Sequence, residues 1–305
     1  MEKKIAEFLN SKTVEDSAKI LGSKKESRFV RTIENLSSTT KKIQVPNAPN
    51  HLILKQTDNH MGIAGVASSK MYNDIGILTP QLHIVQNKNK IDTSTLQQDI
   101  SSIDFLYTAL AGSNFEYSQI VREFFDKNKW AIFYNFNFIN RLLEFMTPEC
   151  LNQMRDIFLI DEIRTDIDRH TRNYFFYKSK DADKYEGIIV FDLEQMQIYF
   201  LTEGGKDDFS DFLLTSYESA TPQQKYDHIN YMQRVKDIRE LIQDGVLSKQ
   251  NLETLIKALK HDFPADIKQA AKERHLHGKA KNKIVDPINR LWEYNQNTIG
   301  KDLGL

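Results

Sequence analysis

The 305-residue chain is short of the features that mark secreted and membrane-spanning proteins. Its single cysteine, Cys150, excludes an intramolecular disulfide framework and any zinc site built from several cysteines, which fits a reducing compartment. No stretch approaches the roughly 18 apolar residues that span a bilayer, and the N-terminus lacks the apolar core of a signal peptide. Glycine and proline are sparse, with 12 and 7 residues, so domain boundaries must be taken from changes in pattern. We therefore expect a cytoplasmic protein without a transmembrane segment.

An excess of charge of one sign is also missing. The chain has 41 Lys and Arg against 42 Asp and Glu, a net charge of -1, so the whole molecule has no bias toward nucleic acid. Hydrophobic residues make up 40% of the chain, enough for one large domain or two modest ones. A bacterial effector secreted into a host cell, peripheral at membranes, would have the same composition, because such export signals are not hydrophobic. That localisation stays open.

The first hundred residues have a mixed α/β pattern. Residues 13–21 begin with a good N-cap and predict a helix. Residues 62–76 have small and apolar side chains at helical spacing and stop at Gly76, where a glycine commonly ends a helix. Short apolar runs predict strands at residues 28–36, 51–56 and 81–86.

From about residue 101 the pattern becomes mainly helical. Apolar residues recur at i, i+3 and i+4 over residues 101–111, 117–128, 137–146 and 149–163. We expect the last of these helices to be amphipathic. A hairpin follows, because the apolar runs 173–178 and 187–193 flank a turn-rich segment. Further helices are predicted at residues 231–245, 249–260, 264–275 and 287–296, with Pro264 and Pro287 as helix starts.

The hairpin predicts a cluster of oxygen ligands. If its turn is centred near residues 182 and 183, Asn173 pairs across from Asp192, and Asp168 lies five residues before Asn173 in the loop that feeds the first strand. Oxygen-only ligands favour Mg²⁺ or Mn²⁺, which proteins commonly hold together with substrate phosphates. An unpaired carboxylate in the apolar run IIVFDL would be costly to bury, so we expect Asp192 to be paired or bound to metal.

These motifs resemble a family of kinases. FLIDEIRTDIDRHTRNYFF followed by IIVFDLE is similar to the catalytic segment of HipA-like and phosphatidylinositol 3-/4-kinase-like kinases, whose pattern is Asp-Arg-His-x-x-Asn and then Asp at a strand end. Upstream, GSKKES resembles the phosphate-covering loop, and LILKQ resembles the strand with the nucleotide-binding lysine. The resemblance implies an α+β, bilobal, atypical protein-kinase-like fold. Its parts would be a small α/β N-lobe (1–100), a mainly helical C-lobe (101–220) and a helical C-terminal region (221–305).

The resemblance also implies a role for each matched residue. Asp168 would orient or deprotonate the acceptor hydroxyl with His170 beside it, although a structural histidine fits position 170 as well. Asn173 and Asp192 would bring Mg²⁺ or Mn²⁺ onto the phosphates of ATP. Lys55 would contact the α- and β-phosphates. The phosphate loop would contain Ser23, Lys24 and Lys25, for which an ordinary polar turn is the alternative.

Two positions depart from the family pattern. Residues 56–76 contain no glutamate, so the usual acidic partner of the nucleotide lysine is missing, and Asp58 or Asp74 stays open as a substitute. Position 166 is Asp where HipA-like proteins commonly have Asn; it either changes metal affinity or a nearby pKa, or lies at the surface. A catalytically inactive nucleotide- or phosphoinositide-binding adaptor therefore stays open.

A basic stretch lies near the C-terminus. Its dense core, KERHLHGKAKNK, is a local positive field suited to a phosphoinositide head group, an inositol phosphate or nucleic acid. Few aromatic residues interleave with the charges, so we expect no DNA, and a solvated helix face is the plain alternative. The candidate anion-binding residues are Lys272, Arg274, Lys279, Lys281 and Lys283.

The sequence therefore predicts an ATP-dependent, Mg²⁺- or Mn²⁺-dependent kinase that acts on a protein Ser/Thr hydroxyl. A protein substrate is favoured over a lipid because no clear membrane-inserting surface is evident. A phosphoinositide kinase is the alternative.

Overall fold

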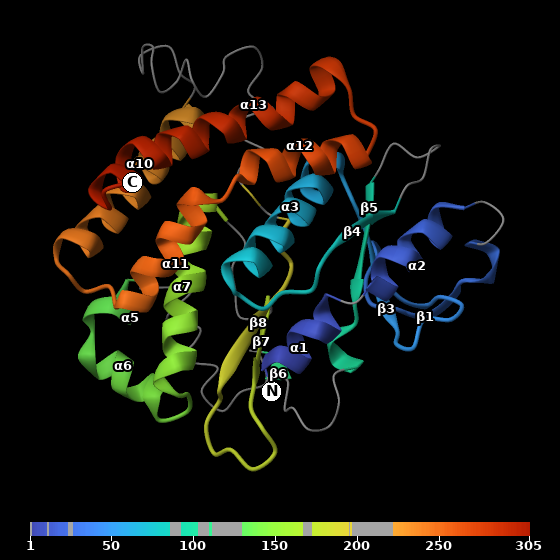
Figure 1. The fold of residues 1–305 in the computed structure, drawn as a ribbon, viewed down its shortest axis with the longest axis horizontal. Helices are drawn as coiled ribbons and strands as arrows, with labels where there is room; N and C mark the ends of the chain where they lie inside the picture. The colour runs from blue at the N-terminus through green and yellow to red at the C-terminus, as the bar shows by residue number, and fades with distance from the viewer. Residues whose placement is uncertain are drawn as a thin grey trace.

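The computed structural model of the chain combines two antiparallel sheets with a large group of helices (Figure 1). It describes residues 2–10, 12–23, 27–85, 93–102, 110–111, 130–166, 173–194, 196 and 222–305. The helix predicted at 117–128 lies outside these residues. None of the described helices is both long enough and apolar enough to cross a membrane.

A five-stranded sheet with the order β1-β2-β3-β5-β4 forms the N-terminal part of the molecule. Its strands are β1 (Arg31–Asn35), β2 (Thr40–Gln44), β3 (Leu52–Thr57), β4 (His83–Val85) and β5 (Thr93–Gln98). All neighbours are antiparallel, and β3 lies in the middle with Lys55 opposite Thr95. The three strands predicted in this region are confirmed. Leu52 of β3 and Val85 of β4 pack in the core of the sheet, whereas β1 is exposed along its whole length.

Three helices accompany this sheet, α1 (Glu2–Leu9), α2 (Lys12–Gly22) and α3 (Asn59–Ile75). The side chain of Asp58 caps α3 by accepting a hydrogen bond from the Met61 N–H at 2.8 Å. Gly76 ends α3 in the left-handed conformation, with φ of 96°, as its position predicts. The helices predicted at 13–21 and 62–76 are therefore confirmed.

A second sheet has the order β6-β7-β8, with β6 at Leu110–Ala111, β7 at Tyr174–Tyr177 and β8 at Gly187–Val190. The predicted hairpin is confirmed as β7 and β8. The helix predicted at 101–111 is wrong where the structure describes it, because 110–111 pair with β7 as a strand and 100–102 form a 3-10 turn. Helical spacing in a short apolar run does not exclude a buried strand.

The register of the hairpin differs by one residue from the prediction. Tyr174 pairs with Val190, so Asn173 lies opposite Phe191, whose N–H donates to the Asn173 carbonyl at 3.0 Å. The connection is centred on residue 182 and is held by Glu186, whose carboxylate accepts hydrogen bonds from the N–H and hydroxyl of Ser179 at 3.0 and 3.1 Å. The direct pairing of Asn173 with Asp192 is therefore wrong.

The helices of the second half pack around the long helix α7. They are α5 (Ala131–Tyr134), α6 (Phe136–Leu143), α7 (Pro148–Arg164), α10 (Pro222–Gln243), α11 (Lys249–Lys260), α12 (Phe263–Glu273) and α13 (Gly278–Asn295), with a π-helical turn at Gln296–Gly300. Helix α11 has its predicted bounds. Helix α13 starts nine residues before Pro287, which lies inside it instead of starting it, because the preceding Ile284 and Val285 already pack in the core.

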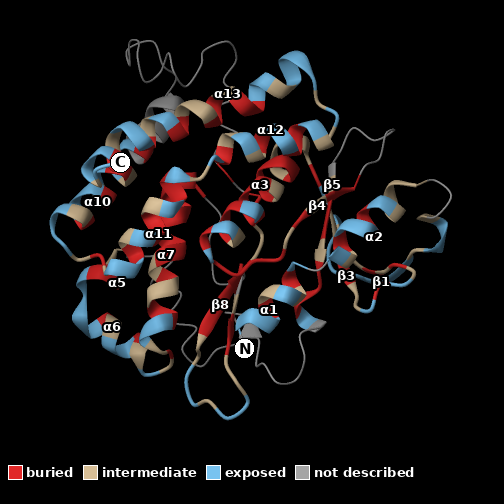
Figure 2. Ribbon diagram, in the orientation of Figure 1, coloured by how far each residue is buried: buried red, intermediate tan, exposed pale blue. Residues whose placement is uncertain are grey.

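Helix α7 is buried on nearly all sides, so the prediction of an amphipathic helix is wrong (Figure 2). Helices α10 and α11 and strand β8 pack against it. Its charged residues are compatible with burial because they have polar partners. Asp156, for example, accepts hydrogen bonds from Asn251 at 2.7 Å and Thr254 at 3.2 Å.

The C-terminal helices share one hydrophobic core with α3 and α7. Helix α12 packs along α3 and is joined to it by polar contacts (Figure 1). Lys70 lies 2.9 Å from a carboxylate oxygen of Asp266, and the Arg274 Nε donates to the Asn59 side chain at 2.9 Å. Residues such as Phe263 are fully buried in this core. The last third of the chain is therefore part of what holds α3 in place.

Candidate functional site

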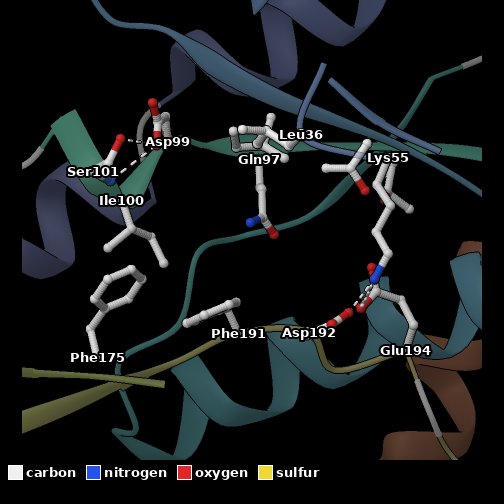
Figure 3. Close-up of a pocket in the computed structure, with 13 residues that line it drawn as sticks. Leu36, Lys55, Gln97, Asp99, Ile100, Ser101, Phe175, Phe191, Asp192 and Glu194 are labelled. Carbon is white, nitrogen blue, oxygen red and sulfur yellow. Dashed lines mark hydrogen bonds and ion pairs between the residues drawn. The ribbon is translucent and has the colours of Figure 1, made fainter. Parts of the chain in front are cut away.

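A cavity of about 250 Å³ lies between the five-stranded sheet and the end of the β7–β8 hairpin (Figure 3). Most of the surface that its lining residues expose is apolar, and the charged side chains of Lys55, Asp192 and Glu194 lie together at one end (Figure 3). The lining residues are Leu36, Thr40, Ile53, Lys55, Thr95, Gln97, Asp99, Ile100, Ser101, Phe175, Phe191, Asp192 and Glu194. Concave, mainly apolar sites with a few polar groups are the usual form of a small-molecule site.

Lys55 extends from β3 into this cavity and contacts two carboxylates (Figure 3). Its Nζ atom makes a short contact with Oδ1 of Asp192 and lies 3.5 Å from Oε2 of Glu194. Burial of the ammonium favours the neutral amine, but the attractions of Glu194 and Asp192 together outweigh it, so the pKa of Lys55 is raised. The lysine therefore carries its charge into the cavity.

Asp192 leaves the strand geometry directly after β8. It has a φ of 58°, in the left-handed region that aspartate tolerates better than most residues, and its side chain is 29% exposed. The expectation that this lone acid is paired is confirmed, because its partner is Lys55, 137 residues earlier. Asn173 is 2% exposed and lies beside the hairpin through its backbone bond to Phe191. Whether Asn173 and Asp192 share one metal ion stays a prediction.

Four of the predicted site residues lie outside the described residues: Asp168, His170, Lys24 and Lys25. Ser23 is described at the end of α2, where its N–H donates to the Ile20 carbonyl at 3.1 Å and its own carbonyl accepts from Ser27 at 3.0 Å. Ser23 does not line the cavity, whereas Leu36 and Thr40, at the two ends of the β1–β2 connection, do. The phosphate-loop role of residues 23–25 stays a prediction.

The two aspartates considered as partners of Lys55 are used elsewhere. Asp58 is the cap of α3, and Asp74 lies 2.9 Å from Lys70. The carboxylates at Lys55 come instead from residues 192 and 194. Burial raises the pKa of Glu194 to about 8, with a further contribution from the charge of Asp192, while Lys55 opposes the shift. Sequence reasoning missed Glu194, for which the only signal was a second acid after an apolar strand.

Asp166 is buried, which excludes the alternative that it lies at the surface. Its carboxylate lies 3.4 Å from Nη1 of Arg164, which is itself completely buried at the end of α7. Arg164 also contacts the Tyr72 hydroxyl at 3.2 Å and donates to the Leu193 carbonyl at 2.8 Å. Sequence reasoning missed this arginine. It connects α3, the end of α7 and the segment between Asp192 and Glu194.

These features define an atypical kinase-like fold, with a lysine on the middle strand of a small sheet facing an aspartate that follows a hairpin. Two solved structures carry the comparison. The chain is similar to the Helicobacter pylori proinflammatory kinase CtkA, with a TM-score of 0.56 and 12% identity over 90% of this chain and 94% of that chain. It is also similar to HipA of Shewanella oneidensis MR-1, from a toxin–antitoxin complex with HipB and operator DNA, with a TM-score of 0.51 and 11% identity.

The match to HipA covers 88% of this chain and 65% of that one. No protein-family model and no curated protein sequence matches the chain. At identities of 11% and 12% the similarity establishes the fold alone, and the predicted kinase-like fold is confirmed.

Proposed function

We propose that this protein is an ATP-dependent kinase that transfers the γ-phosphoryl group to a Ser/Thr hydroxyl of a protein. The observation that carries the proposal is the meeting of Lys55 and Asp192 inside an apolar-walled cavity of a kinase-like fold. A lysine and a metal-binding aspartate are the two charged groups that phosphoryl transfer requires around a nucleotide. The similar Helicobacter pylori protein CtkA is described as a kinase, which agrees with this choice.

Several residues of the site have a task in the proposed reaction. Ile53, Phe175 and Phe191 provide apolar surface for the nucleotide base, and Lys55 neutralises phosphate charge. Asp192 opens onto the cavity with a hard oxygen donor, so it fits Mg²⁺ or Mn²⁺, with Asn173 as the second ligand. The bound ion would neutralise the charge that develops on the transferred phosphoryl group. Asp168, in the segment before Asn173, orients the acceptor hydroxyl.

The test is transfer of label from γ-labelled ATP to a generic protein substrate, with Mg²⁺ or Mn²⁺. We expect wild type to transfer label and Asp192→Ala to be inactive. The matched control is Asp183→Ala, which changes an exposed aspartate in the turn of the same hairpin and is expected to leave transfer intact. Transfer that survives Asp192→Ala would contradict the metal-ligand assignment. ATP binding without any transfer or autophosphorylation would favour the adaptor.

A lipid acceptor is the second candidate, favoured by the basic stretch. Lys272, Lys279 and Lys283 are exposed near the junction of α12 and α13, whereas Arg274 is bonded to Asn59. Deleting the stretch is not a usable test, because α12 and α13 contribute to the core. We propose instead to compare wild type with a variant in which the three exposed lysines are changed to glutamate. Equal binding to phosphoinositide vesicles and equal activity would leave the stretch as a solvated face.

A further inference from the structure

One buried carboxylate beside the cavity has no role in the reaction as described above. Glu194 is 3% exposed, and its Oε2 atom has no hydrogen-bond partner among the residues that the structure describes. The ammonium of Lys55 lies 3.5 Å from this atom. A buried carboxylate is unfavourable unless a cation or hydrogen bonds compensate it, so an apolar side chain would serve packing better at this position. The presence of glutamate here therefore calls for a role that depends on Lys55.

Helix α3 is shaped to accept this side chain. A Cβ atom at Gly65 would lie 2.7 Å from Cγ and 3.3 Å from Cδ of Glu194. Cβ atoms essentially never lie within 3.0 Å of another heavy atom in this way, so any other residue at position 65 would require the Glu194 side chain to shift. Glycine inside a helix is less favourable than alanine by roughly 1 kcal/mol, which argues that Gly65 has a packing reason. The space that a side chain of α3 would fill is taken by Glu194.

Lys55 has two acidic neighbours with different surroundings. The side chain of Asp192 is 29% exposed and opens onto the cavity, whereas that of Glu194 is 2% exposed and packs against α3. A divalent cation on the phosphates would bind the accessible carboxylate of Asp192. Glu194 is then the neighbour that remains beside the lysine. No glutamate of α3 competes for this position, because residues 56–76 contain none.

We infer that Glu194 is a positioning residue that holds Lys55 in the cavity, that it replaces the helix glutamate which this chain lacks, and that Gly65 provides its space. The inference rests on the proposed function in so far as Lys55 binds nucleotide phosphates. It assigns the two acids distinct tasks, with Asp192 for the metal and Glu194 for the lysine.

The first test is a double-mutant cycle on ATP binding, measured by calorimetry with Lys55→Met, Glu194→Gln and the double variant. If Glu194 acts through Lys55, each single variant binds ATP about tenfold more weakly, which is about 1.4 kcal/mol, and the double variant binds no more weakly than Lys55→Met. Independent, additive losses in the double variant would overturn the inference, as would wild-type affinity in Glu194→Gln. Glu194→Asp, which keeps a carboxyl group at this position, is expected to bind ATP more tightly than Glu194→Gln.

The same cycle measured by urea unfolding of the nucleotide-free protein separates this inference from the proposed function. A non-zero coupling between positions 55 and 194 supports the pair even if wild type binds no ATP, in which case the proposed function alone fails. A coupling of zero overturns the pair whether or not ATP binds.

The third test concerns Gly65 and needs no nucleotide. In wild type, Gly65→Ala is expected to lower the unfolding midpoint, because its Cβ collides with Glu194. In a Glu194→Ala background the same change is expected to raise the midpoint, because the collision is gone and alanine favours the helix. A change of the same sign in both backgrounds would overturn the role of Gly65.

Discussion

Removing the buried charge of Arg164 is expected to destabilise the fold strongly. Arg164 is 0% exposed and contacts Asp161 at 3.6 Å, Asp166 at 3.4 Å and the Leu193 carbonyl at 2.8 Å. Arg164→Met preserves much of the volume but removes the cation that faces two buried carboxylates. Breaking a buried charge pair by removing one partner costs about 3–5 kcal/mol, and lost hydrogen bonds to a charged group agree with this range at about 1.5–3 kcal/mol each.

The measurement is urea unfolding followed by tryptophan fluorescence, with three further variants for comparison: Arg239→Met, Asp166→Asn alone, and the double variant of Arg164→Met with Asp166→Asn. Arg239→Met breaks an exposed ion pair with Asp302 and is expected to change little. Adding Asp166→Asn to Arg164→Met removes one of the two opposing charges and is expected to restore part of the loss. The reasoning is refuted if Arg164→Met loses no more stability than Arg239→Met. It is refuted equally if Asp166→Asn lowers the stability of Arg164→Met by as much as it lowers the stability of the wild-type protein.

Three further predictions concern the ends of helices. Burial raises the pKa of Asp266, but hydrogen bonds from His261 and Lys70 outweigh this effect and hold the pKa below its usual range. The contribution of Asp266 to the stability of the fold is therefore present above about pH 3.9, and it is lost as the pH falls through the lower pKa of the folded state. Asp266→Asn is expected to lower the urea midpoint at pH 7 by an amount that shrinks as the pH falls below 3.9; an effect independent of pH contradicts the ion pair. Thr165 ends α7 with φ of 59°, and its buried hydroxyl has no hydrogen-bond partner among the described residues. Thr165→Gly should relieve about 1–2 kcal/mol of backbone strain and, after the entropy cost of glycine, stabilise the protein by about 1 kcal/mol. A loss of stability in Thr165→Gly would contradict the strain at residue 165. At the other end of α7, Thr147→Ala should lower the stability by about 1 kcal/mol, because it removes the hydroxyl that accepts a hydrogen bond from the Cys150 N–H.

Much of the local structure follows from the sequence. The periodicity of α11 predicts its bounds, Gly76 predicts the end of α3, and the short apolar run that ends at Lys55 predicts a strand. These features depend on residues within a few positions of one another, so they can be read without the rest of the chain. The order of Lys55, Asn173 and Asp192, together with the motif around Asp168, also led to the kinase-like fold that the comparisons support.

Pairing across the molecule had to come from the tertiary structure. The register of the hairpin depends on the hydrogen bonds of Ser179 and Glu186 in its turn, and a shift of one residue changes which side chain faces Asn173. The burial of Asp166 depends on Arg164, whose place inside the core is not visible in a helix pattern.

The partner of Lys55 is the clearest case of this division. The sequence alone shows that Lys55 lies at the end of one apolar strand, that Asp192 follows a second apolar strand, and that α3 contains no glutamate that could pair with the lysine. The choice of Glu194 required Gly65 to leave a space on α3 and the hairpin to bring residue 194 beside residue 55. The partner of a buried charged group cannot be predicted from its neighbours in the sequence. Its energy depends on the groups that surround it in space, and those groups lie far apart in the chain.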